Sequence, residues 1–510
     1  MRHEVAAWSK RHALALVAGL TVFAVPFLAY ENFVLNHFYR FGAVLLDTGL
    51  LADLAWHKPF WLPTPPIVGG QSFYAIHVSP LLTLLSTLSW AVPVGMPQWF
   101  AIFSGIAHAL AGIAVFLALR CVVGLRDGTG LAVSTGLAVL FAFNGLAMAQ
   151  VRYPHFEILI ASSMMLFLTA WRLGRTRLAV AALATALICR EDAGLHVTAF
   201  LVVVMVLDRW RGVVRPDGHR TMVFAVVAFA YSIAALAMSH ALFPGSSSFV
   251  RVYLGNPPLH GLTPPLLATR VASIMVGRAY IVLPAVLAIV WAVAARNPYI
   301  VAGYIACAPW GAVNVLAQSP LAGLLDSYYA FPFMVAAFWP LIGWSMMPSR
   351  QGRSSREVLA GFFLMTLASF SSLGFQHNPS RIPLWSGFAD RVSAAERRAT
   401  DQAIAAIVRD RARLGRLAVS NGVASLSPRD FQVADVQPPF GSGPHDTVID
   451  MGDRYNSDEM RALAARSGLS HVCTVSGTRL RVATRPGSPQ SAAADCLTGG
   501  QDGGGSGPLR

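Results

Sequence analysis

The chain has 510 residues, of which 55% are hydrophobic and only 13% are charged. This composition excludes an ordinary soluble globular protein, and several apolar segments approach the length that crosses a bilayer. The net charge of +14 does not indicate nucleic acid binding, because much of it lies in short loops between apolar segments, as the positive-inside rule expects. Residues 376–510 hold 16 Arg and 13 Asp or Glu, so we expect a membrane domain over 1–375 followed by a water-soluble domain.

The apolar segments predict about eleven membrane-spanning helices. Basic residues precede the first segment and no small-residue cleavage site follows it, so we expect an uncleaved first helix. Two segments, 156–171 and 178–190, are short for an apolar core about 30 Å thick, and we expect their ends to be buried in protein. In chain order the segments lie near 13–30, 98–119, 129–149, 156–171, 178–190, 193–207, 221–243, 268–292, 299–317, 329–347 and 357–374.

Loop charge predicts that the N-terminus is cytoplasmic. With that orientation every inner loop carries at least one Arg, as in "WRLGRTR" and "DRWRGVVRPDGHR", in agreement with the positive-inside rule. The outer loops are poorer in Arg and hold most of the Asp, Glu and His. The same orientation places the C-terminal domain outside the membrane.

The first outer loop, residues 31–97, is far longer than a connection needs. Within it "FGAVLLDTGLLADLAW" has helical periodicity, which predicts an amphipathic helix in the membrane interface. Asp53 is interpreted as a polar-face or capping residue. Asp47 lies in apolar surroundings, where a carboxylate has a raised pKa unless a cation compensates, which suits a general base or a metal ligand. His77 opens a further apolar stretch, which we interpret as a re-entrant or surface-lying helix.

Three ionisable residues, Arg190, Glu191 and Asp192, interrupt the apolar stretch "ALICREDAGLHVTAF". Such groups are costly in hydrocarbon, and the predicted topology places them at the outer membrane edge, where one short helix turns into the next. A solvated loop or a local ion pair is one interpretation. The other is a reaction site in which the Arg190 guanidinium clamps a phosphate and Glu191 or Asp192 orients it or binds a metal.

Other polar residues on the predicted outer side would complete such a site. His155 and Glu157 begin a helix after Pro154, and two residues apart on a helix they point in different directions, so a metal site made by this pair alone has weak support. Glu157 also suits a helix N-terminus. With Asp47 as the catalytic residue, the predicted substrate-binding residues are Arg190, Glu191, Asp192, His77, His155, Glu157, Arg251 and Tyr328.

The order of several short motifs resembles an uncharacterised family of prokaryotic multi-spanning membrane proteins, domain of unknown function 2079. The motifs are "LLDTGLLADLAW", "HVSPLLTLLSTL", "YPHFEILI", "LICREDAGLHV" and "SYYAFPF". The resemblance covers most of the chain, and that family in turn resembles the GT-C class of membrane glycosyltransferases.

This resemblance implies an all-α polytopic membrane protein of GT-C type, which takes a sugar from a polyprenyl-phosphate donor at the outer face of the cytoplasmic membrane. The acceptor would be a lipid, a glycan or a protein. An acidic residue in the first outer loop would act as base or help to hold a divalent metal, Mg²⁺ or Mn²⁺. Asp47 fits this role, with Glu157 as a further metal ligand. A metal, an Arg contact or both would stabilise the leaving phosphate.

The C-terminal domain, residues 376–485, is expected to be a small extracytoplasmic α/β unit. Its pattern predicts a charged helix over 389–415, strands at "RLAVSN" and "DTVIDMG", a short helix near 457–467 and a hairpin in "HVCTVSGTRLRVAT". Cys473 and Cys496 can pair if this domain is extracytoplasmic. Residues 486–510 have low complexity and are expected to be disordered.

Two other functions compete with glycosyl transfer. A transporter or flippase of lipid-linked intermediates predicts ionisable groups near the bilayer midplane, on broken helices with repeat symmetry. A non-catalytic scaffold or sensor requires none of the clustered acids and Arg. Because the ionisable residues gather at one predicted face and the sequence has no clear repeat, a glycosyltransferase is the favoured prediction.

Overall fold

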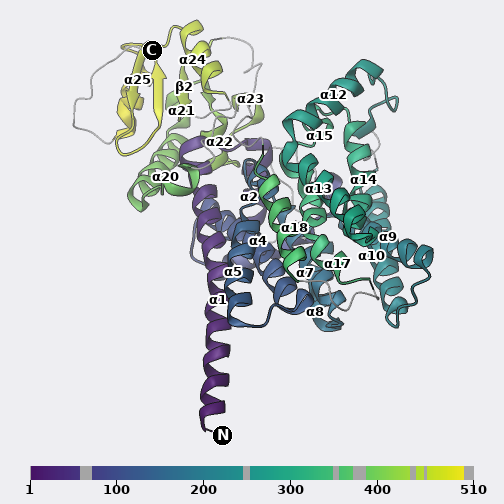
Figure 1. Cartoon of the computed structure of the whole chain (residues 1–510). Helices are drawn as coiled ribbons and strands as arrows, with labels where there is room; N and C mark the ends of the chain where they lie inside the picture. The colour runs from purple at the N-terminus through teal and green to yellow at the C-terminus, as the bar shows by residue number, and fades with distance from the viewer. Residues whose placement is uncertain are drawn as a thin grey trace. The chain divides into compact units, whose positions relative to one another are not determined.

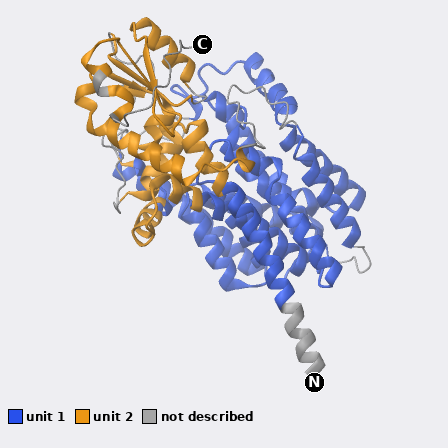
Figure 2. Cartoon of the chain, turned by 90° about the vertical axis from the view of Figure 1, so that its left-hand side faces the viewer, with its two compact units in different colours: residues 1–30, 73–81, 103–376 blue, residues 31–72, 82–102, 377–510 orange. Residues whose placement is uncertain are grey.

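The computed structural model describes residues 2–57, 72–244, 253–347, 355–371, 386–436, 444–452 and 456–498. Arg251, one of the predicted site residues, lies outside these ranges. The chain forms two compact units, which are coloured separately in Figure 2. Unit 1 comprises residues 1–30, 73–81 and 103–376, and unit 2 comprises residues 31–72, 82–102 and 377–510.

Unit 1 is built from helices in the part of the chain that the structure describes (Figure 1). Helix α1 continues from it into unit 2, and α4 enters it from unit 2. The elements in chain order are α1 (Arg2–Asn36), the 3₁₀ turn η4 (Phe73–Ala75), α4 (Met96–Leu117), the π-helical turn η6 (Ala118–Val123), α5 (Gly128–Ala142), α6 (Gly145–Val151), α7 (Ile158–Arg172), α8 (Thr176–Leu187), α9 (Ala193–Arg211), α10 (Gly218–Leu242), α12 (Pro264–Gly277), α13 (Ala279–Ala295), η7 (Pro298–Val301), α14 (Ala302–Val315), α15 (Pro320–Gly323), η8 (Ser327–Ala330), α16 (Phe331–Phe338), α17 (Pro340–Trp344) and α18 (Ser355–Ala368).

The helices of unit 1 make the chain a multi-spanning membrane protein. Among the described residues six helices are long and apolar enough to cross a membrane, or seven if α12 and α13, bent by 80°, form one broken span. Each of the eleven predicted apolar segments coincides with a helix or a pair of helices, but the count of eleven spans stays a prediction. Helices α7 and α8 are among the shorter ones, as their apolar segments predict.

Two helix junctions in unit 1 position polar side chains. Helix α6 ends at Val151 and α7 begins only at Ile158, because Pro154 in the link lacks the N–H that a continuing helix needs. The second junction, residues 188–192, joins α8 to α9. Helix α9 then packs closely on α10, since a Cβ added at Gly194 would lie 2.0 Å from the carbonyl oxygen of Ala228. Only glycine permits that approach.

Unit 2 combines the C-terminal region with most of the predicted outer loop 31–97. Helix α3 also begins in unit 1. The elements are the π-helical turns η1 (His37–Phe41) and η2 (Leu45–Gly49), α2 (Leu50–Trp56), α3 (Pro80–Leu88), the 3₁₀ turn η5 (Ser89–Ala91), α19 (Ser386–Ala389), α20 (Ala394–Arg409), α21 (Arg411–Leu414), β1 (Leu417–Val419), α22 (Asn421–Leu426), α23 (Val433–Val436), β2 (Thr447–Asp450), α24 (Ser457–Arg466), β3 (His471–Thr474), β4 (Arg481–Thr484), α25 (Pro489–Ala494) and the 3₁₀ turn η9 (Asp495–Thr498).

The four strands form one mixed sheet in the order β1-β2-β4-β3. Strands β1 and β2 are parallel, and β4 pairs antiparallel with both β2 and β3. Alternate residues along a strand face opposite sides of a sheet. Leu417, Val419 and Ile449 therefore belong to one core, whereas Ala418 and Val448 pack on the other side, against α24. The predicted strands correspond to β1 to β4 and the predicted short helix to α24, while the helix predicted over 389–415 is divided into α20 and α21.

The predicted outer loop contributes to the core of unit 2. Leu45 is fully buried in the same apolar cluster as Val419 and Ile449, and its N–H donates to Oδ1 of Asn421 at 3.2 Å. The predicted helix in "FGAVLLDTGLLADLAW" is present as η2 and α2. The next predicted helix is α3, nine residues long. The turn η2 and helix α2 thus pack on the C-terminal domain, where a Cβ added at Gly49 would lie 2.8 Å from Cβ of Ser425 and Asp53 pairs with Arg429.

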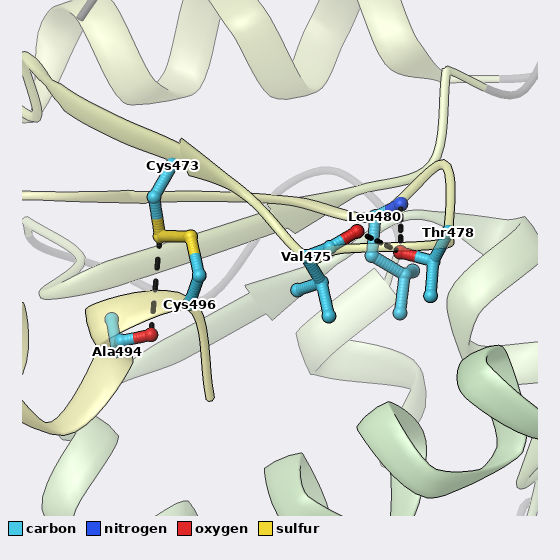
Figure 3. Close-up of a disulfide and its surroundings, with 6 residues drawn as sticks. All are labelled: Cys473, Val475, Thr478, Leu480, Ala494 and Cys496. Atoms are coloured by element: carbon cyan, nitrogen blue, oxygen red, sulfur yellow. Dashed lines mark hydrogen bonds between the residues drawn. A yellow bond between two sulfur atoms is a disulfide. The ribbon is translucent and has the colours of Figure 1, made fainter. Parts of the chain in front are cut away.

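Part of the tail that the sequence predicts to be disordered is ordered. Residues 489–498 form α25 and η9, because the Ser488 hydroxyl accepts a hydrogen bond from the N–H of Ser491 at 3.1 Å and Cys496 forms a disulfide with Cys473 of β3 (Figure 3). The Cα atoms of the two cysteines are 5.7 Å apart. Residues 499–510 lie outside the described residues.

Candidate functional site

The two helix junctions of unit 1 are joined through Arg190. Its Nη1 donates to Oε1 of Glu157 at 2.6 Å, while Nε and Nη2 donate to the two oxygens of Asp192, each at 2.6 Å. The Arg190 side chain is only 5% exposed and that of Glu157 only 1%. The guanidinium that the sequence predicts to clamp a phosphate is therefore held by two carboxylates of the protein itself.

A histidine stands beside each of these carboxylates. His155 pairs through Nδ1 with the second oxygen of Glu157, and Nε2 of His196 lies 3.7 Å from Oδ2 of Asp192. The prediction that His155 and Glu157 point in different directions is wrong, because α7 begins at Ile158 and His155 lies in the non-helical link before it. The result is a continuous chain of side chains, partly exposed at His155 and Asp192 and buried elsewhere. We call it the Arg190 network: His155, Glu157, Arg190, Asp192 and His196.

Aromatic rings enclose the Arg190 network. The Arg190 guanidinium carbon lies 5.9 Å from the ring centre of Trp310 and 5.5 Å from that of Phe331. The same two rings meet the His196 ring edge to face, at 4.9 and 5.0 Å. Such rings exclude water and favour a cation over their faces, so they strengthen the ion pairs inside.

Burial and the Arg190 charge together set the pKa values of two neighbouring groups, Asp192 and Tyr253. Burial alone would raise the pKa of Asp192, but the charge of Arg190 and its hydrogen bonds, with His196 nearby, hold that pKa well below its ordinary value. Burial raises the pKa of Tyr253 above its ordinary value, with Arg190 acting in the opposite direction. Asp192 is thus a permanent anion and Tyr253 stays neutral at physiological pH.

Glu191 makes a separate connection. Its Oε1 lies 2.8 Å from Nδ1 of His77, and its Oε2 accepts the N–H of Val78 at 2.9 Å. The N–H of Leu81 also donates to the carbonyl of Ile188 at 2.9 Å. Glu191 and His77, both predicted as site residues, therefore tie the segment 73–81 to the link between α8 and α9.

A small pocket borders the His155 end of the Arg190 network. His155 stacks on Tyr328, with ring centres 4.2 Å apart and planes 17° apart. These two rings form part of its wall, and the residues that line it are His108, Gln150, Val151, His155, Ile158 and Tyr328. The predicted residues His155 and Tyr328 thus lie together, and the residues around them are packed so closely that the pocket has no room for a water molecule.

The residues around Glu157 do not fit a metal ion, and a metal at Asp47 stays a prediction. In the ranges that the structure describes, no three His, Cys, Asp or Glu side chains form a group able to hold a metal ion. The two oxygens of Glu157 are already taken by Arg190 and His155. We therefore assign no metal ion to Glu157 in the reaction proposed below.

The acids of the first outer loop belong to unit 2. Asp47 lies half-buried in η2, and its convergence with the Arg190 network stays a prediction. Asp53 is 1% exposed and pairs with Nδ1 of His57 at 2.6 Å and with Nε of Arg429 at 2.9 Å. The interpretation of Asp53 as a polar-face or capping residue is therefore wrong, because its side chain points into unit 2 and not toward water.

Sequence reasoning missed several residues of this site. His196 follows Asp192 by four residues, the helical spacing that brings two side chains together, so a signal for it was present. His108 and Gln150 lie inside apolar segments, and only a three-dimensional structure brings them to His155. In the sequence, nothing distinguishes Trp310 and Phe331 from other apolar core residues.

Comparison with known proteins shows a structural likeness to one solved structure but no match in sequence. No family model matches the sequence, and no curated protein matches it, so the resemblance to domain of unknown function 2079 stays a prediction. Among solved structures, the chain is similar to the crystal structure of ArnT from Cupriavidus metallidurans bound to undecaprenyl phosphate. The identity is 12% and the TM-score is 0.44, over 95% of this chain and 99% of that chain. Because this identity and this TM-score are low, the function must be inferred from the residues of this chain.

Proposed function

We propose that the chain is a membrane glycosyltransferase that transfers a sugar from a polyprenyl-phosphate donor to a lipid, glycan or protein acceptor at the outer face of the cytoplasmic membrane. The observation that carries this proposal is the buried pair of His155 and Glu157, which Arg190 holds beside a pocket in a body of apolar helices. A lipid-linked substrate requires a membrane body, and glycosyl transfer to a hydroxyl requires a base.

In this proposal His155 removes the proton of the acceptor hydroxyl. The acceptor oxygen forms a bond to the anomeric carbon, the bond from that carbon to the phosphate oxygen breaks, and the polyprenyl phosphate leaves with the electron pair. Glu157 orients the imidazole and stabilises the imidazolium that forms, as a carboxylate behind a histidine does in hydrolases. Arg190 fixes Glu157, so it acts as a positioning residue. Asp47 is the competing base, proposed from the sequence.

The test is sugar analysis of the cell envelope in a deletion strain that carries variants of the gene. We expect deletion to remove one sugar modification, wild type to restore it, and His155→Asn to fail at matched expression. Asp47→Asn decides whether the outer-loop acid is also required. His219→Asn, which changes an exposed histidine, is the matched control and should restore the sugar. An unchanged envelope after deletion would overturn the proposal.

A transporter or flippase of lipid-linked intermediates is the second candidate. The bend of 80° between α12 and α13 favours it, because transporters bind substrate at broken helices. In that case the lipid-linked sugar would accumulate unused in the deletion strain, and another enzyme would still attach any lipid-linked sugar supplied at the outer face, in the deletion strain as well as with His155→Asn. Accumulation with intact transfer therefore separates the two functions.

A further inference from the structure

Three arginines form a basic surface at one end of unit 1, and we call them the Arg175 cluster: Arg175, Arg177 and Arg220. Arg175 directly precedes α8, Arg177 lies in the first turn of α8, and Arg220 lies in the first turn of α10. The Arg190 network lies at the opposite ends of α7 and α8. These helices have 15 and 12 residues, which corresponds to roughly 20 Å of helix, so the Arg175 cluster is a separate place in the molecule.

Two contacts bring the Arg175 cluster together. The indole N–H of Trp171, near the end of α7, donates to the hydroxyl of Thr221 in α10 at 3.1 Å. In the turn between α7 and α8, a Cβ added at Gly174 would lie 3.7 Å from Nη1 of Arg220. Arg220 therefore lies beside the turn that carries Arg175.

The Arg175 cluster has no acid to balance its charge. Among the residues that the structure describes, none of its three side chains forms a hydrogen bond or an ion pair. Of the two acids in the following turn, Asp208 is paired with Arg215 at 2.7 Å, and Asp217, before α10, forms no ion pair with a described residue. Neither α8 nor α10 has an acidic residue in its first turn. Because the helix dipole disfavours cations at a helix N-terminus, these three charges favour an external anion.

Two further arginines at the same end of unit 1 have a simpler explanation. Arg209 and Arg211 are exposed in the last turn of α9, where the helix dipole favours a cation. Helix α10 begins shortly after α9 ends, so these residues lie at the same end as Arg220. The dipole and the positive-inside rule account for this pair, whereas they do not account for the convergence of the Arg175 cluster.

Exposed apolar side chains continue from the Arg175 cluster along both helices. They are Leu178 and Val180 on α8, and Met222, Val223 and Val226 on α10. Helix α10 is long and apolar enough to cross a membrane, and the exposed apolar side chains of such a helix face the lipid chains. The Arg175 cluster therefore lies where the lipid-facing surface ends, which is the level of the phospholipid phosphates.

We propose that the Arg175 cluster binds the headgroup of an anionic phospholipid. Guanidinium groups pair with phosphate oxygens in a bidentate geometry, and basic residues at the membrane ends of helices recognise anionic lipids. The negative headgroup of phosphatidylglycerol suits three cations without an acid, whereas the choline group of phosphatidylcholine brings a further positive charge. The acyl chains would lie along the exposed apolar faces of α8 and α10. This site is independent of the proposed glycosyl transfer.

The test is native mass spectrometry of the full-length protein, titrated with dioleoylphosphatidylglycerol and with dioleoylphosphatidylcholine. We expect the first molecule of phosphatidylglycerol to bind about tenfold or more tightly than the first molecule of phosphatidylcholine. The double variant Arg175→Gln with Arg220→Gln should reduce this preference to about twofold or less. If that variant does not fold, the exposed single variant Arg177→Gln should still weaken the preference, and an unchanged preference would contradict the site.

The double variant Arg209→Gln with Arg211→Gln is the matched control, because it removes two positive charges from the same end of unit 1. It should keep the preference for phosphatidylglycerol. An equal loss in the two double variants would show diffuse attraction by a basic surface and overturn the inference, as would the absence of any preference in the wild type. Ammonium phosphate at the concentration of the lipid should not displace phosphatidylglycerol. Displacement would assign the Arg175 cluster to a free phosphate ion and would also overturn the inference.

Discussion

Arg190 donates three hydrogen bonds of 2.6 Å to the carboxylates of Glu157 and Asp192. One positive charge thus lies between two negative charges in a buried site, and the imidazoles of His155 and His196 lie at either end. Removing one partner of a buried ion pair destabilises a protein strongly, because the remaining charge is left uncompensated. At the residue scale the network is therefore also a stability element.

We predict that Arg190→Gln destabilises the protein by about 3–5 kcal/mol, since it leaves two buried carboxylates facing each other. Glu157→Gln should cost less, because the pair of Arg190 and Asp192 remains neutral. The measurement is the midpoint of thermal unfolding in detergent, with exposed Arg209→Gln as the control. Equal unfolding midpoints of the Arg190→Gln and Arg209→Gln proteins would show that the Arg190 network does not stabilise the fold.

At the scale of elements, α2 and the segment after α22 are joined through Asp53 and Arg429 within unit 2. Because the Asp53 side chain is 1% exposed and Arg429 is 26% exposed, the carboxylate depends on its partner more than the guanidinium does. We predict that Arg429→Ala destabilises unit 2 by about 1–3 kcal/mol, and more than Asp53→Asn, which can still accept hydrogen bonds.

A double-mutant cycle separates this contact from the other interactions of Arg429. Side chains in one ion pair usually show coupling energies of about 0.5–3 kcal/mol. We expect coupling within this range between Asp53→Asn and Arg429→Ala, measured as protection of the C-terminal region from limited proteolysis. Strict additivity of the two effects would show that the ion pair does not hold α2 to the C-terminal domain.

Local sequence patterns predict the helices and strands well, but they predict the tertiary contacts between these elements poorly. Hydrophobic periodicity located the short helices α7 and α8 and the strands of the C-terminal sheet, because those signals depend on neighbouring residues only. The apolar pattern predicts a start for α7 that is a few residues too early, and a helical His155 would point away from Glu157. The burial of Leu45 beside Ile449 depends on segments some 400 residues apart along the chain, which no local pattern records.

The candidate site was predicted in part for the same reason. Arg190, Asp192, His155, Glu157 and Tyr328 were named from their residue types and their predicted side of the membrane. Their partners were not, since a pair such as Arg190 and Glu157 follows from how two helix junctions pack. A carboxylate two residues from an arginine can serve a ligand or that same arginine, and only the structure assigns it to the arginine.

At the scale of the whole molecule, the proposed reaction requires the site and the C-terminal domain to lie outside the cytoplasm. The disulfide between Cys473 and Cys496 bears on this question, because such bonds persist in oxidising compartments and are rare in the cytosol. Cys121 provides an internal reference. It is exposed, and the predicted orientation places it on the cytoplasmic side, where thiols stay reduced.

We predict that Cys473 and Cys496 resist alkylation in intact cells and react with a maleimide–polyethylene glycol reagent only after lysis, denaturation and reduction. Cys121 should be blocked at once by membrane-permeable N-ethylmaleimide. Replacing the buried Cys189 and Cys307 by Ala beforehand leaves three thiols whose states can be counted by gel shift. Alkylation of Cys473 and Cys496 without reduction would place the domain in a reducing compartment and contradict the predicted orientation, on which the access of an outer-leaflet donor to the Arg190 network depends.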